Sequence, residues 1–219
     1  MTHGRTRYGV ATLLAVALLS SGCSAPEEDG ALPPAGASYE TLPPYETVPE
    51  PGRTIEATPP ASLSGLEGYL VAVVVPDVSA SSATLLSALE DVVSAGGGDL
   101  QQFPAAEGAA DPVGAALDQA LDVEPDLVVG LGDGVVDMFG FESAQRLGQQ
   151  FLVVGAQLAE PTDNVTAVVW DGATSRGSAA GPDGDLVDAS ITEQRGEAAF
   201  RAGLASVQDE TTGVVLYLD

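Results

Sequence analysis

Apolar residues from position 69 onward follow two alternating patterns. Residues 69–75 form an unbroken apolar run rich in β-branched side chains, which is typical of a central parallel strand because helices cover both of its faces. In residues 79–93 the apolar side chains instead recur every three or four positions, which indicates the buried face of a helix. Three consecutive glycines, Gly96 to Gly98, end this helical pattern.

The same alternation continues to the end of the chain and predicts a layered fold. We predict further strands at 100–103, 127–131, 151–154, 165–170 and 214–218. We predict further helices at 112–121, 135–147 and 191–207. Strands that alternate with helices over about 150 residues indicate an α/β domain with a mostly parallel sheet and helices on both faces.

The segment before this domain, residues 23–67, has the composition of a linker. From residue 24 onward it contains nine of the fifteen prolines, eight acidic residues and few large apolar side chains. Such a segment buries too little apolar surface to fold on its own, so we expect a disordered spacer. Residues 39–44 and 45–50 form a short tandem repeat, for which a spacer is favoured over a polyproline II ligand.

The first 22 residues have the three parts of an export signal. Arg5 and Arg7 precede an apolar run at 10–19, which is shorter than the about 20 residues that span a bilayer. Small residues then lead to Cys23 in a pattern similar to the lipobox of bacterial lipoproteins, with the leucine four positions before the cysteine instead of three. We expect a signal peptide at 1–22, with an ordinary secretory signal as the alternative.

Cys23 is the only cysteine of the chain, which therefore cannot form an internal disulfide. Lipidation explains a lone exported cysteine, and more than one acyl chain on it gives a stable membrane anchor. We expect Cys23 to carry the lipid that holds an extracytoplasmic protein to the outer face of the cell membrane.

The charge balance excludes several classes of function. The chain has 32 acidic and 7 basic residues, with a net charge of −25. This charge repels nucleic acid, whose binding requires Lys and Arg, so we expect no nucleic-acid partner. The only histidine, His3, lies in the signal peptide, and no lysine is present. Because the commonest general base and metal ligand are then missing, we expect no enzyme activity and no cofactor.

Two local motifs point away from phosphate or metal binding. The turn after the first predicted strand reads Pro76-Asp77-Val78-Ser79, not the glycine-rich sequence of a dinucleotide site. The acidic residues from Asp183 to Asp188 offer oxygen atoms, which calcium prefers, but they lack the spacing of an EF-hand. A solvated acidic loop is favoured there.

Four segments occur in an order that resembles one known family. They read VAVVVPDV at 71–78; PDLVVGLG at 125–132; FLVVG at 151–155 with NVTAVVW at 164–170; and EAAFRAGLA at 197–205 with TGVVL at 212–216. This order is similar to that of the basic membrane protein (BMP) family, lipoprotein substrate-binding components of ABC importers with the type 1 periplasmic-binding, flavodoxin-like fold. The resemblance implies a small-molecule ligand, nucleosides being among those the family binds, and an ABC permease as partner.

The resemblance also implies a division of the chain. Residues 68–171 correspond to the first α/β lobe of the family, residues 172–190 to a flexible acidic loop, and residues 191–219 to the first helix and strand of the second lobe. The turn at 78–83 lacks the aromatic residue with which the family holds its ligand.

Three residues are candidates for ligand contact. Asp77 and Asp133 directly follow predicted strands, and ligands of open α/β sheets bind at the carboxyl ends of strands. The alternative for both is capping of the following helix. Trp170, the only tryptophan, has either a stacking or a packing role. The resulting hypothesis is a lipid-anchored, solute-binding-like protein; the alternative is an envelope lipoprotein whose α/β domain contacts another protein.

The anchor is directly testable. We expect the protein to incorporate a fatty-acid probe, and Cys23→Ala to abolish the labelling because it removes the acceptor thiol. Gel fluorescence of the two forms measures this, and labelling that persists in the variant would refute lipidation at this position.

Overall fold

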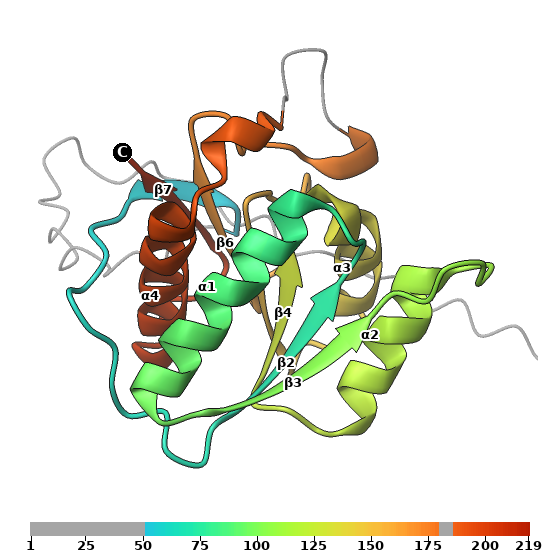
Figure 1. The fold of residues 1–219 in the computed structure, drawn as a ribbon, viewed down its shortest axis with the longest axis horizontal. Helices are drawn as coiled ribbons and strands as arrows, with labels where there is room; N and C mark the ends of the chain where they lie inside the picture. The colour runs from blue at the N-terminus through green and yellow to red at the C-terminus, as the bar shows by residue number, and fades with distance from the viewer. Residues whose placement is uncertain (1–50, 180–185) are drawn as a thin grey trace, which may run out of the picture. The chain divides into compact units, whose positions relative to one another are not determined.

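The computed structural model describes residues 51–179 and 186–219. The signal peptide, Cys23 and the tandem repeat lie outside the described residues. The seven described strands form one sheet in the order β1-β7-β6-β5-β4-β2-β3, and every neighbouring pair is parallel (Figure 1). The predicted α/β class is thus confirmed, with a sheet that is entirely parallel.

The elements have the following bounds. The strands are β1 (Arg53–Glu56), β2 (Leu70–Val75), β3 (Asp99–Pro104), β4 (Leu127–Leu131), β5 (Gln150–Val154), β6 (Val165–Trp170) and β7 (Val214–Leu218). The α-helices are α1 (Ala80–Gly96), α2 (Pro112–Asp122), α3 (Val136–Ser143) and α4 (Glu193–Gln208). Short 3₁₀ turns are η1 (Asp133–Val135), η2 (Gly177–Ala179) and η3 (Asp188–Ser190).

Helices cover both faces of the sheet, as the unbroken apolar strands predicted. In β4, Val129 and its alternate neighbours pack in the core cluster that contains α1 and α4, whereas Val128 packs in the cluster that contains α2 and α3. Both residues are fully buried. This two-sided burial explains why the central strands contain no polar alternation.

The strand order places one crevice in the middle of the sheet. From β2 the chain crosses to β3 on one side, and then returns to β4 on the other side of β2. This is the flavodoxin-like order, in which ligands bind outside the carboxyl ends of the strands where the winding direction reverses. The loops that follow β2 and β4 lie at this reversal point.

The folded domain begins before residue 68, so the predicted boundary of the linker at residue 67 is wrong. Residues 53–56 form the edge strand β1, in parallel register with β7 from the pair Arg53–Val214 to the pair Glu56–Tyr217. Composition did not reveal this strand because backbone hydrogen bonds to a distant strand stabilise it, and only Ile55 contributes a half-buried apolar side chain.

Residues 57–68 then cross the helices α4 and α1 as an ordered strap. The Arg201 guanidinium donates a hydrogen bond to the Pro60 carbonyl (3.1 Å). Near the end of the strap Leu66 is fully buried, and a Cβ atom on Gly96 or Gly98 would come within 2.7 or 3.1 Å of its side chain. The two glycines therefore make room for Leu66 at the end of α1.

Residues 191–219 do not begin a second lobe in this structure, so that prediction is also wrong. β7 extends the same sheet beside β6, and α4 packs on α1 and on the sheet. Two glycines allow the close approach: a Cβ atom on Gly203 would lie 2.6 Å from Leu152, and one on Gly196 would lie 2.9 Å from Ala88. Burial against this sheet gives the helix the apolar contacts that a separate lobe would otherwise supply.

A substitution in the strap tests whether it belongs to the fold. We expect Leu66→Ala to lower the free energy of unfolding by about 2–5 kcal/mol, because it leaves a cavity in the core. Urea denaturation followed by circular dichroism measures this. Leu147→Ala, at a position that is 65% exposed, is the control and should change stability by less than about 0.5 kcal/mol. If Leu66→Ala and Leu147→Ala both had equally small effects on stability, residues 57–68 would belong to the linker and not to the folded domain.

Candidate functional site

Asp77, one of the sequence candidates, is tied into the start of α1. Its Oδ1 atom accepts hydrogen bonds from the Ser79 backbone N–H and from the Ser82 hydroxyl, both at 2.8 Å. Ser79 is itself the N-cap of α1, since its hydroxyl accepts from the Ser82 N–H. The observed contacts of Asp77 are therefore those of a helix-capping residue.

These contacts also change the acidity of the Asp77 carboxyl. Partial burial acts to raise its pKa, but the hydrogen bonds from Ser79 and Ser82 outweigh it, and the pKa lies below the ordinary value. Because the donors favour the charged form, Asp77 is a carboxylate at neutral pH. It adds negative charge to the carboxyl edge of the sheet.

Asp133 lies at the same edge but is differently held. It is exposed and begins η1 after Gly132, whose φ of 68° and ψ of −162° are accessible to glycine alone. The N-cap residue of η1 is Gly132, so no side chain caps this turn. A Cβ atom on Gly134 would lie 2.8 Å from the Pro76 side chain, so the loops that carry the two aspartates touch.

Trp170 lies in the core rather than at a ligand surface. Its side chain is fully buried among the residues that pack with α1 and α4. Its indole N–H donates to the carbonyl and hydroxyl oxygens of Ser190, both at 3.2 Å. Burial and a satisfied donor favour the packing role, and they place Ser190 over the carboxyl end of β6.

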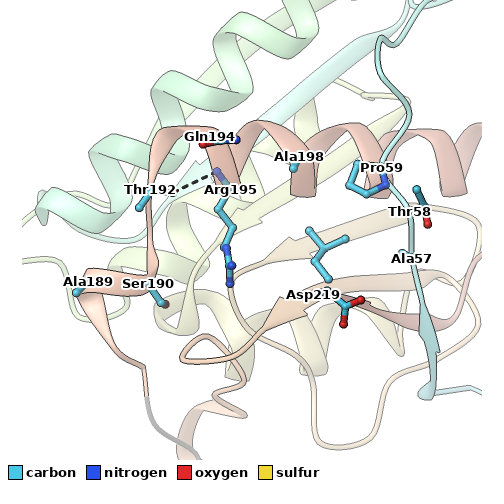
Figure 2. A pocket seen from close by; sticks show the side chains of 11 residues that line it. Ala57, Thr58, Pro59, Ala189, Ser190, Thr192, Gln194, Arg195, Ala198 and Asp219 are labelled. Carbon is cyan, nitrogen blue, oxygen red and sulfur yellow. Dashed lines mark hydrogen bonds between the residues drawn. The ribbon is translucent and has the colours of Figure 1, made fainter.

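An open cavity of about 650 Å³ lies at the same edge of the sheet, beside β1 and β7 (Figure 2). Three separate segments line it: the residues that follow β1, the end of β7, and the chain from η3 into the first turns of α4. Its lining residues are Ala57, Thr58, Pro59, Ala189, Ser190, Thr192, Gln194, Arg195, Ala198, Leu218 and Asp219.

The lining of the cavity contains a cation and an anion. Arg195 extends from the first turn of α4 and, in the view of Figure 2, lies between Ser190 and Asp219. The ion pairs within residues 51–179 and 186–219 are Arg146–Glu142 and Arg201–Glu197. Arg195 and Asp219 therefore form no ion pair with each other in this part of the chain.

The charged groups at this edge of the sheet also affect the hydroxyl of Tyr217. Its hydroxyl donates a hydrogen bond to the Asp171 carboxylate. This bond raises the pKa of Tyr217, burial and the nearby charges of Asp171 and Asp219 add to the increase, and the Arg195 cation opposes it. The charges of Asp171, Asp219 and Arg195 thus all act on Tyr217 near the carboxyl end of the sheet.

Sequence reasoning found the aspartates of the reversal point but missed Arg195 and Asp219. The cavity combines residues 57–59, 189–198 and 218–219, and no local pattern links segments so far apart. One signal was available: a positive side chain in the first turn of a helix opposes the helix dipole, which makes Arg195 unusual for its position.

Two further properties concern only the part of the chain that the structure describes. Among those residues, none of the helices has the length and apolar character needed to cross a bilayer. The same residues include no cluster of three or more Asp, Glu, His or Cys side chains arranged to bind a metal ion. Residues 183–185 of the acidic loop lie outside the described residues.

Comparison with known proteins does not assign this chain to a family. No family model matches the sequence, and no curated protein is significantly similar to it. An ABC transporter solute-binding protein from Aeropyrum pernix K1 superposes with a TM-score of 0.41 and 15% identity over 48% of this chain, which spans 29% of that protein. A fragment described as a lipoprotein from Peptoclostridium difficile 630 superposes over 67% of this chain and its own full length, with a TM-score of 0.41 and 12% identity. At these TM-scores neither likeness supports an assignment, and the α/β class rests on the strand pairing itself.

Substitution of Asp77 separates helix capping from ligand contact. We expect Asp77→Ala to lower the free energy of unfolding by about 1 kcal/mol because two donors lose their acceptor, with a smaller loss for Asp77→Asn. A carboxylate with a lowered folded-state pKa stabilises the fold above its ordinary pKa, and this contribution disappears as the pH falls through the lowered value. Urea denaturation between pH 7 and pH 2.5 should therefore show the wild type and Asp77→Asn converging in acid. If the wild type and Asp77→Ala were equally stable at pH 7, the capping role of Asp77 would be contradicted.

Proposed function

We propose that this protein is a lipid-anchored, extracytoplasmic solute-binding protein of the BMP type, which holds a small molecule at the carboxyl edge of its sheet for an ABC permease. The observation that carries this proposal is the open cavity beside β1, β7 and α4. The cavity opens at the carboxyl edge, where ligands of parallel α/β sheets bind, but it lies beside β1 and β7 and not at the reversal point between β2 and β4. Its volume of about 650 Å³ lies within the usual range of small-molecule sites.

The chemistry of the lining supports binding rather than catalysis. Thr192, Gln194 and Arg195 offer polar groups on one side, and Ala57, Pro59 and neighbouring residues offer apolar surface on the other. Six of the eleven lining residues are polar or charged, so the cavity offers more hydrogen-bonding groups than the mostly apolar pocket that is usual for a small-molecule site. None of its eleven lining residues is a histidine, cysteine or lysine.

The position of the tether is compatible with ligand capture. The chain enters the sheet at Arg53, at the amino end of β1, whereas the cavity begins at Ala57, beyond its carboxyl end. A lipid anchor on Cys23 would therefore connect to the edge of the sheet opposite the cavity. The proposed site then faces away from the point where the tether attaches.

An open cavity leaves part of its ligand exposed to water. High affinity usually requires that 70–90% of the surface of a ligand is buried, so a second surface must close over the bound molecule. In the proposed function the permease, or a second copy of this chain, supplies that surface. Isolated protein should accordingly bind its ligand with modest affinity.

One observation favours the alternative of a protein-binding lipoprotein. Val78, in the loop after β2, is 92% exposed, and Val187, near the end of β6, is 48% exposed. The Ser81 hydroxyl donates a hydrogen bond to the Asp188 carboxylate and so joins the two segments that carry these valines; a contiguous exposed apolar patch there would be a contact surface. This edge would then bind a protein partner without any small ligand.

Blocking the cavity tests the proposed function. We expect at least one compound in a panel of amino acids, sugars and nucleosides to raise the melting temperature of the full-length protein in detergent. At a hundredfold excess over its dissociation constant, a ligand adds about 2.7 kcal/mol of stability. Thr58→Trp places an indole in the cavity from an exposed position and should abolish the shift.

The matched control is Gln119→Trp, which adds the same side chain at an exposed position of α2, away from the cavity. It should keep the ligand-induced shift. A panel without any shift, or a shift that survives Thr58→Trp, would overturn the proposed site and favour the protein-binding alternative.

A further inference from the structure

The cavity beside α4 has a charge arrangement that restricts what it can bind. Arg195 contributes a guanidinium and Asp219 a carboxylate to the same lining, and the two do not form an ion pair with each other. Two opposite charges that line one cavity without neutralising each other are both available to a third molecule. A ligand that carries both charges can satisfy both groups.

The first turn of α4 strengthens the positive side of the cavity. This helix has 16 residues, and its N-cap, Thr192, lies in the cavity lining together with Gln194. The amino end of a helix carries a partial positive charge, and its free N–H groups bind anions. Glu193, the acidic residue of this turn, is exposed and does not line the cavity. A guanidinium beside these N–H groups favours a carboxylate, which it can bind through two parallel hydrogen bonds.

The charge of the whole protein limits the choice further. With a net charge of −25, the protein repels a simple anion on approach. A simple cation is attracted over long range, but the positive charge of Arg195 repels it inside the cavity. A zwitterion has no net charge to be repelled, and each of its ends finds an opposite charge.

The remaining lining argues against a flat aromatic ligand. None of the eleven lining residues is aromatic, so a nucleobase would have no ring on which to stack. Apolar side chains such as Ala198 and Leu218 can instead contact a small aliphatic group. The lining thus suits a compact molecule with two charged ends and a short apolar part.

We propose, on the basis of the proposed function above, that the ligand of this cavity is a zwitterion of the free amino acid type. Its carboxylate binds the Arg195 guanidinium and the first turn of α4, and its ammonium group binds the Asp219 carboxylate. The side chain on the carbon that joins the two charged groups lies against the apolar wall. The protein would therefore recognise amino acids by their main-chain groups, with limited selection among side chains.

Calorimetric titration of the full-length protein in detergent tests this ligand class. The twenty free L-amino acids form the panel, and the best ligand is compared with two analogues: the amine that lacks its carboxylate and the acid that lacks its amino group. We expect each analogue to bind at least about tenfold more weakly than the amino acid, since each leaves one charged group of the cavity without a partner.

Two charge-neutral variants locate the two contacts. Arg195→Gln should weaken the amino acid but not the amine, and Asp219→Asn should weaken the amino acid but not the acid. Each variant therefore removes the discrimination against one analogue only, an effect that general damage to the fold would not produce. Arg176→Gln, at an exposed position outside the cavity, is the control and should leave all three affinities unchanged.

The outcomes separate this inference from the proposed function. A sugar or nucleoside that binds and is blocked by Thr58→Trp, in the absence of amino acid binding, would overturn the zwitterion and leave solute binding intact. If both analogues bound as tightly as the amino acid, the zwitterion would likewise be overturned and solute binding would stay intact. Absence of binding by every compound would overturn both proposals together.

Discussion

The close packing of α4 against α1 and the sheet is the contact on which the proposed site depends. Gly196 and Gly203 leave no side chain between the helix and its neighbours, so α4 lies directly on Ala88 and Leu152. This position brings the first turn of α4 beside the ends of β7 and β1, where the cavity opens. A larger residue at either glycine would push the helix outward and separate Arg195 from the other cavity wall. Two glycines that do not line the cavity therefore determine the position of the residues that do.

The sequence was a good guide wherever structure depends on neighbouring residues. The apolar run at 69–75 predicted a strand buried on both faces, and the spacing at 79–93 predicted the helix that follows it. The sequence was a poor guide wherever distant segments stabilise each other. Residues 53–56 form a strand because β7 offers its free edge, and no pattern within those four residues shows that partner. In the same way, the periodicity of α4 predicted its helical state but not the sheet on which it packs.

The same contrast between local patterns and distant contacts applies to the candidate site. Topology alone places the residues after β2 and β4 at the reversal point, and the contact of Gly134 with Pro76 confirms that these two loops meet. What Asp77 does there depends on two serine donors whose geometry cannot be derived from spacing. Trp170 can be buried because Ser190, twenty residues later, accepts hydrogen bonds from its indole N–H. Arg195 and Asp219 share a cavity only because the final helix and strand join the first sheet.

The edge strand β1 also determines how the domain would bear mechanical load. The chain enters at the amino end of β1, and the cavity lies beyond the carboxyl ends of β1 and β7. Tension between a membrane anchor and a partner at the opposite edge would then run along the strand axes. Under such shear the hydrogen bonds between β1 and β7 bear the force together, whereas a sideways pull would break them one after another. In the proposed function, the parallel pairing of β1 with β7 would therefore resist tension applied through the tether.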